Sequence, residues 1–281
     1  MGLEYVTHLE KVFAAARNEG RAVLIGYLPA GYPSVDGGID AMRAMVDAGV
    51  DVVEVGLPYS DPTMDGPVIQ QAVDAALADG VRVTDVLRTV EAVAATGVPT
   101  LVMTYWNPVD RYGPAAFARD LAAAGGAGAI TPDLPPEESG LWMEACRREG
   151  LDGVFLVAPS SSDERITLVS ATGSGFVYAT AVMGVTGARA TVGGRAAGLV
   201  ARVRALTDRP VAVGLGVSDG DQAAEVAGYA DGVIVGSALV RALRDGGPTA
   251  VAALTRELAA GVRAATPAGR GTVPDGDPVR S

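Results

Sequence analysis

Apolar and polar positions along the chain follow two alternating periods, which predicts strands alternating with helices. Several short runs rich in Val, Ile and Leu are nearly continuous in apolar residues, as is typical of parallel strands covered on both faces. Longer stretches between them repeat apolar residues at the spacing of one helix face. The expected strands cover residues 22–28, 51–57, 99–105, 128–133, 153–159, 175–181, 210–216 and 232–238.

The helical patterns fall between these strands and often end in Gly, as in "AGVDV" and "ATGVP", which is a helix C-terminal signal. A further helix is expected over about residues 4–19, ahead of the first strand. The expected helices between strands cover residues 35–49, 68–80, 83–97, 114–126, 137–150, 163–173, 196–208 and 220–230.

Strand–helix alternation implies a parallel sheet of the α/β class. Eight such units in about 250 residues favour a (β/α)8 TIM barrel over a doubly wound sheet. We expect residues 1–265 to form this single barrel domain, with the extra helix at its N-terminal end. Residues 266–281 are rich in Gly, Pro and charge, and we expect a disordered tail there.

The composition of the chain limits which classes of binding partner and which cellular compartment are expected. The net charge of −11 argues against a surface for nucleic acid or anionic membranes. The sequence contains no apolar run of about 18 residues and no basic segment followed by an apolar one at its start. The single cysteine, Cys146, excludes an intramolecular disulfide framework. A cytoplasmic protein is therefore expected.

The only histidine is His8 and the only lysine is Lys11, both in the expected N-terminal helix. A Ser-His-Asp triad, a His-rich metal site and a Schiff-base lysine in a pocket are all disfavoured by this placement. The chemistry is expected to depend on carboxylates, tyrosines and backbone groups, with no metal.

The stretch "VEVGLPYSDPTMDGP" (53–67) places Glu54 inside an apolar strand and Asp61 and Asp65 in the loop that follows. A buried carboxylate costs on the order of several kcal/mol unless it is paired, hydrogen-bonded or neutralised. Active sites of such barrels form at the carboxyl ends of the strands. These residues are therefore candidates for one site.

Other candidate polar residues lie at the end of one expected strand or inside another. Tyr105 and Asn107 end the third expected strand, and Tyr178 lies in the sixth. Structural roles remain open for all of these candidates. Glu54 can accept backbone N–H bonds, Asp61 can cap a turn, and Asp65 can cap the next helix, while the tyrosines can be core aromatics with satisfied hydroxyls.

Glycine clusters follow the last three expected strands, in "GVTGAR" (184–189), "GLGVSD" (214–219) and "VGSALV" (235–240). Glycines there let backbone N–H groups approach an anion at the positive end of a helix, where such barrels commonly bind phosphate. Tight turns alone are the alternative explanation. Loop 182–195 is long enough to be a mobile lid. The candidate phosphate ligands are Gly187, Gly216, Gly236 and Ser237.

Over roughly residues 8–260 the chain resembles the tryptophan synthase α-subunit family. The motif "VEVGLPYSDPTMDGPVIQ" is similar to that family's signature, and "PDLPPEES", "GVTGAR", "GLGVS" and "DGVIVGSALV" follow in the family's order. The resemblance implies retro-aldol cleavage of indole-3-glycerol phosphate to indole and glyceraldehyde 3-phosphate. Glu54 matches the family's catalytic Glu and Asp65 its catalytic Asp.

The resemblance also implies roles for other residues. Thr186 matches a lid threonine, and Tyr178 matches a tyrosine near the substrate. Tyr105 is also expected to contact the substrate. Gly187, Gly216, Gly236 and Ser237 match the phosphate contacts.

The family further implies a partner, the tryptophan synthase β subunit, in a heterotetramer through which indole passes by a tunnel. Pyridoxal phosphate is expected on that subunit, so no cofactor is expected in this chain. Asp61 and Asn107 are expected at the interface.

Three alternatives stay open. The first is a stand-alone indole-glycerol-phosphate lyase, for which "AVM" (181–183) leaves room because the family often has a polar Ser-Arg pair there. The second is a weakly active subunit that mainly activates a β subunit. The third is another phosphate-binding barrel enzyme, such as a sugar-phosphate isomerase.

Overall fold

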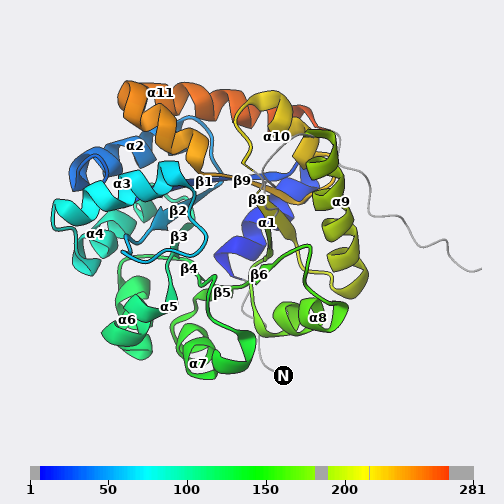
Figure 1. Cartoon of the computed structure of the whole chain (residues 1–281), viewed down its shortest axis with the longest axis horizontal. Coiled ribbons are helices and arrows are strands. Elements are labelled where there is room, and N and C mark those ends of the chain that lie inside the picture. Colours follow the sequence, from blue (N-terminus) through cyan, green and yellow to red (C-terminus); the bar gives the residue numbers. More distant parts are fainter. Residues whose placement is uncertain (1–6, 181–188, 215, 266–281) are drawn as a thin grey trace, which may run out of the picture.

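The strands of the computed structural model pair in parallel and form a nearly closed barrel surrounded by helices (Figure 1). The structure describes residues 7–180, 189–214 and 216–265. Within these ranges the strand order is β5-β4-β3-β2-β1-β9-β8-β7-β6. The strands are β1 (Val23–Pro29), β2 (Val52–Gly56), β3 (Thr100–Met103), β4 (Gly128–Ile130), β5 (Asp152–Val154), β6 (Leu156–Val157), β7 (Val177–Thr180), β8 (Val211–Gly214) and β9 (Gly232–Val235).

The predicted (β/α)8 TIM barrel is confirmed, with one strand divided in two. The segment expected as strand 153–159 forms β5 and β6, which Phe155 separates. β5 pairs with β4, while β6 pairs with β7. The two strands together occupy one position around the barrel, and the division lets the same short segment bond to both neighbours.

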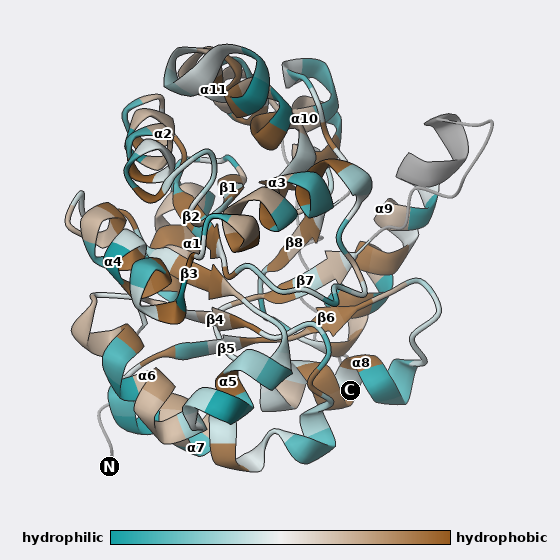
Figure 2. Ribbon diagram, turned by 60° about the vertical axis from the view of Figure 1, so that its left-hand side comes forward, coloured by the Kyte–Doolittle hydropathy of each residue, from teal (hydrophilic) through white to brown (hydrophobic). Residues whose placement is uncertain are grey.

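Helices cover the outside of the barrel and present their apolar faces to the strands, as Figure 2 shows by the brown strands inside and the teal on outer helix faces. In the described ranges no helix is long and apolar enough to cross a membrane. The helices between strands are α2 (Val35–Asp47), α3 (Pro67–Ala78), α4 (Val83–Ala94), α5 (Trp106–Tyr112), α6 (Pro114–Ala123), α7 (Gly140–Glu149), α8 (Asp163–Thr172), α9 (Arg189–Leu206) and α10 (Gly220–Ala227), with a 3-10 turn η1 at Pro136–Glu138.

Two helices are not among those expected from the sequence. α5 starts directly after Tyr105, and the Asp133 carboxylate accepts a hydrogen bond of 2.8 Å from the Trp106 N–H at its start. The last strand was expected over residues 232–238, but β9 ends at Val235. α11 (Ser237–Ala264) therefore begins inside the expected strand segment.

The expected lid loop is only partly described, and the expected tail is not described. α9 begins at Arg189, so residues 189–195 of the expected lid loop are helical. The rest of that loop, with Thr186 and Gly187, lies outside the described residues, as does the expected tail 266–281.

The N-terminal helix, expected over 4–19, is α1 (His8–Asn18), and it closes the amino end of the barrel. Thr7 caps the helix, and the Thr7 and Glu10 side chains form a reciprocal capping box. The apolar face of α1, formed by Leu9, Phe13 and Ala16, is buried. It packs on Phe176, directly before β7, and on inward-facing residues of strands all round the barrel: Val23, Ile25, Val52, Leu101, Ile130, Val154, Ala212 and Ile234.

The apolar layer that α1 forms with these strand residues is called the barrel floor below. We predict that Leu9→Ala lowers the free energy of unfolding by about 3 kcal/mol, because the fully buried Leu9 side chain fills this floor. Urea unfolding of the variant and the parent chain measures the difference. Lys11→Ala is the matched control on the exposed face of the same helix and changes the free energy by about 0.5 kcal/mol or less. Equal effects of the two substitutions would contradict this role for the floor.

Candidate active site

A cavity of about 530 Å³ opens at the carboxyl ends of the strands. Its walls come from strands β1, β2, β3, β7, β8 and β9, from the loop after β2, from the segment after β8, and from α3 and the start of α11. The lining residues are Tyr27, Glu54, Thr63, Met64, Asp65, Gly66, Ile69, Met103, Tyr178, Thr180, Gly214, Gly216, Ile234, Gly236 and Ser237. Of the predicted site residues, the cavity brings together Glu54, Asp65, Tyr178, Gly216, Gly236 and Ser237.

Among the described strand residues, Glu54 is the one carboxylate that lines this cavity. Its side chain is 1% exposed, and in register it lies beside Tyr27 of β1 and Leu101 of β3. The Glu54 Oε1 atom has no hydrogen-bond partner among the described residues. Glu54 therefore does not fit the alternative role of a carboxylate held by backbone N–H groups.

Burial of Glu54 raises the pKa of its carboxyl from 4.5 to about 8, because an apolar interior disfavours the charged form. A carboxyl with a pKa near the working pH is able both to donate and to accept a proton. Glu54 therefore has the properties of a proton shuttle.

Asp65 lies in the loop between β2 and α3, on another wall of the same cavity. Burial raises its pKa, and a hydrogen bond from the Tyr105 side chain acts against that rise. The first helical turn of α3 begins with Gly66 and Pro67 and has no side-chain cap. The Asp65 carboxylate is thus not used as a helix cap, and it remains available to a ligand.

Tyr105 supports the Asp65 loop and does not line the cavity. Its hydroxyl accepts a hydrogen bond of 3.0 Å from the Met64 N–H. The ring packs against Tyr59, with ring centroids 5.3 Å apart. A further bond of 2.6 Å, from the Gln70 side chain to the Asp65 carbonyl, holds the other side of the loop.

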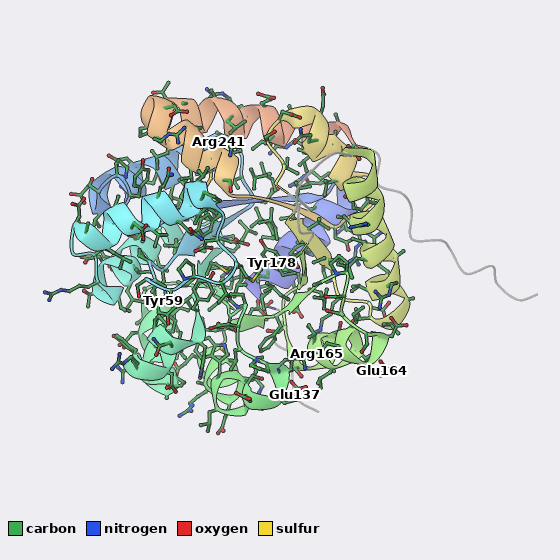
Figure 3. All side chains as sticks on the ribbon, in the orientation of Figure 1. Tyr59, Glu137, Glu164, Arg165, Tyr178 and Arg241 are labelled. Carbon is green, nitrogen blue, oxygen red and sulfur yellow. The ribbon has the colours of Figure 1, made fainter. Side chains whose placement is uncertain are left out.

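Tyr178 lies near the centre of the barrel (Figure 3) and lines the cavity from β7. Burial, and then the charges of Glu54 and Asp65, raise the pKa of its hydroxyl well above the ordinary value. Gly214 of β8 makes room for this hydroxyl, since a Cβ atom at Gly214 would lie 2.7 Å from it.

The expected phosphate ligands that the structure describes converge beside the start of α11. Gly216 has a φ of +74°, which favours glycine. Gly236 is the N-cap of α11 and makes no side-chain cap, so backbone N–H groups at the first turn are open to an anion. We call Gly216, Gly236 and Ser237 the anion cradle. Among the described lining residues there is no Lys or Arg.

Asp61 and Asn107 are exposed at the rim of the barrel. Ser60 donates a hydrogen bond of 2.6 Å to the Asp61 carboxylate. The Asn107 side chain donates one of 3.1 Å to the hydroxyl of Tyr59, which Figure 3 labels at the same rim. Met64, in the loop between them and the cavity, is 45% exposed.

Several cavity residues were not predicted from the sequence, chiefly Tyr27, Ile69, Met103 and Ile234. They are apolar or aromatic residues that look like ordinary core positions in a strand or helix pattern. Only the alternation of inward and outward positions gave a signal for them. Within the described ranges no group of His, Cys, Asp and Glu side chains is arranged to hold a metal ion.

The chain was compared with known proteins. Residues 13–266 match the family model described as "Tryptophan synthase alpha chain". The alpha chain from Streptomyces avermitilis is 62% identical over 91% of this chain and 94% of its own length. That from Mycobacterium avium is 61% identical over 92% and 95%. A structure of Mycobacterium tuberculosis tryptophan synthase superposes with a TM-score of 0.88 at 57% identity, covering 92% of this chain and 99% of that one.

The raised pKa of Glu54 predicts a specific pH dependence of stability. The unfolded chain loses this proton above pH 4.5, whereas the folded chain keeps it until about pH 8. Between these values each pH unit therefore lowers the free energy of unfolding by up to about 1.4 kcal/mol.

Glu54→Gln removes this titration, so the variant gains stability relative to the parent chain as the pH rises from 5 to 8. Urea unfolding at four pH values in this window measures the gap. Glu91→Gln, on the exposed face of α4, is the control. A gap that stays constant across the window would show that the Glu54 pKa is not raised.

Proposed function

Because the chain belongs to the tryptophan synthase alpha chain family, we propose that this cavity cleaves indole-3-glycerol phosphate to indole and glyceraldehyde 3-phosphate. The observation that carries the proposal is a buried, unpartnered Glu54 in the same cavity as Asp65 and the anion cradle. A retro-aldol cleavage needs a proton shuttle, a group that stabilises positive charge on the indole and an anchor for the phosphate. The catalytic unit proposed is residues 1–265.

Glu54 serves as the proton shuttle in this proposal. Its protonated carboxyl delivers a proton to indole C3, which makes the ring an indolenine that accepts electrons. The resulting carboxylate then takes the proton of the hydroxyl on the adjacent carbon. The O–H electron pair forms the aldehyde C=O, the C–C pair returns to the indole ring, and Glu54 is protonated again.

Asp65 stabilises the charge that forms on the indole. Protonation at C3 places positive charge on the ring nitrogen, and a partly buried carboxylate that accepts a hydrogen bond from the ring N–H stabilises that charge. Tyr105 holds the Asp65 loop, and its hydrogen bond keeps the Asp65 pKa from rising further.

The anion cradle binds the phosphate. The backbone N–H groups at the start of α11 and the Ser237 hydroxyl are the donors, and the helix dipole adds to them. Thr186 and Gly187, which lie outside the described residues, are proposed to complete the cradle and lid. Tyr178 is proposed to contact the substrate from β7.

Alpha chains of this family pair with a β subunit, and pyridoxal phosphate belongs to that subunit, while the alpha chain itself carries no cofactor. We propose that Asp61 and Asn107, exposed at the rim around the cavity, contact the β subunit. A cytoplasmic location is part of the same proposal and is supported by the unpaired, buried thiol of Cys146.

Glu54→Gln is predicted to lower the rate of indole release about 10²–10⁴-fold, because Gln cannot exchange a proton. Asp65→Asn is predicted to lower it about 10²-fold or more. The assay follows indole formed from indole-3-glycerol phosphate by the purified chain, with and without a β subunit. Glu91→Gln, remote from the cavity, keeps the parent rate.

Each result of that assay separates the possible functions. Slow turnover alone that rises with the β subunit supports the proposal, whereas fast turnover alone indicates a stand-alone lyase. β-subunit activation without turnover indicates an activating subunit. Full activity of Glu54→Gln would contradict the proposed mechanism.

Ser237→Asp is predicted to raise the KM for indole-3-glycerol phosphate about tenfold or more, because the added carboxylate repels the phosphate. An acidic residue at a helix start favours the helix, so thermal stability should hold or rise. Ser237→Ala, which adds no charge, should have a smaller effect on KM. Equal KM values for the two variants would argue against phosphate at this helix.

A further inference from the structure

Tyr27 of β1 lines the cavity, but the mechanism above gives it no role. It is the in-register neighbour of Glu54 on the adjacent strand, and its side chain is 7% exposed. Since directly opposed residues on parallel strands point to the same face, Tyr27 and Glu54 both point into the barrel. The Tyr27 hydroxyl has no hydrogen-bond partner among the described residues.

The Tyr27 side chain reaches from the anion cradle toward the two carboxylates. A Cβ atom at Gly236 would lie 3.3 Å from the Tyr27 ring, so the ring passes close to the cradle. A Cβ atom at Gly56 would clash with the Tyr27 hydroxyl, so the absence of a side chain at Gly56 makes room for that hydroxyl. Gly56 lies two residues beyond Glu54, on the same face and nearer the mouth.

The electrostatic environment of the Tyr27 hydroxyl agrees with a position near both carboxylates. After burial, the charges of Asp65 and then Glu54 raise the pKa of Tyr27 well above its ordinary value. The hydroxyl therefore lies within electrostatic reach of both carboxylates and remains a protonated hydrogen-bond donor.

The same arrangement occurs on the other side of the barrel. Tyr178 of β7 is in register with Ala212 of β8, and Gly214, two residues on, makes room for its hydroxyl. The two tyrosine–glycine pairs thus use the same geometry. Tyr27 differs because its ring also approaches Gly236 of the anion cradle.

In indole-3-glycerol phosphate, two carbons separate the reacting C1 from the phosphate: C3, which bears the phosphate ester oxygen, and C2, which carries a hydroxyl. This hydroxyl neither gains nor loses a bond in the cleavage. A donor between the cradle and the carboxylates is placed to contact that segment.

We propose that the Tyr27 hydroxyl donates a hydrogen bond to the C2 hydroxyl of the glycerol chain and so turns the reacting C1 hydroxyl toward Glu54. This role rests on the proposed function. It makes Tyr27 a positioning residue that selects substrates with an oxygen on C2.

The test compares Tyr27→Phe with the parent chain on two substrates, in the complex with the β subunit. One is indole-3-glycerol phosphate, and the other is its 2-deoxy analogue, which keeps the C1 hydroxyl and is still cleavable to indole and an aldehyde. Tyr27→Phe should lower kcat/KM about tenfold for the natural substrate and about twofold or less for the analogue, because the analogue lacks the bonded oxygen. Tyr229→Phe, which changes a half-buried tyrosine whose buried hydroxyl lies outside the cavity, should leave both values unchanged.

Equal losses on the two substrates would overturn the proposal and leave Tyr27 as a packing residue. An unchanged kcat/KM for the natural substrate would overturn it as well. A parent chain that cleaves neither substrate would instead contradict the proposed function itself, so the two failures are distinguishable.

Discussion

The buried carboxyl of Glu54 is the constraint around which the cavity is arranged. Its strand is apolar on both sides, and the described residues give Oε1 no partner, so the neutral form is favoured over the charged one. Such a group persists only where the surrounding fold is stable enough to carry it. The closed floor and the continuous parallel pairing of the barrel supply that stability.

The two ends of the barrel divide these tasks. At the amino end, α1 and the inward-facing aliphatic residues form an apolar layer with ordinary core packing. At the carboxyl end, loops and a helix start bring together carboxylates, phenols and free N–H groups. Ile234, Met103 and Tyr178 belong to both regions, because they pack on the apolar layer and line the cavity. The functional end is therefore built directly on the stabilising end.

The sequence predicted the parts of this structure that have a local signal. Glu54 was found because a charge interrupts an apolar run, and Asp65 because it follows in a turn-rich loop. Tyr27 gave no such signal, since a tyrosine in a strand reads as core, and its place beside Glu54 depends on the register of two strands. The division of β5 from β6 depends likewise on which neighbours each half pairs with. α5 was missed because its first N–H is bonded by Asp133, which lies 27 positions away in the sequence.

The apolar floor also bears on how a small aromatic molecule moves after it forms. Leu9 and Phe13 pack closely against the strands, so the barrel interior is closed at its amino end. The open end of the cavity lies at the carboxyl ends of the strands, near the rim where Asp61, Met64 and Asn107 are exposed. A partner surface that covers this rim is therefore the one that meets a product as it leaves the cavity.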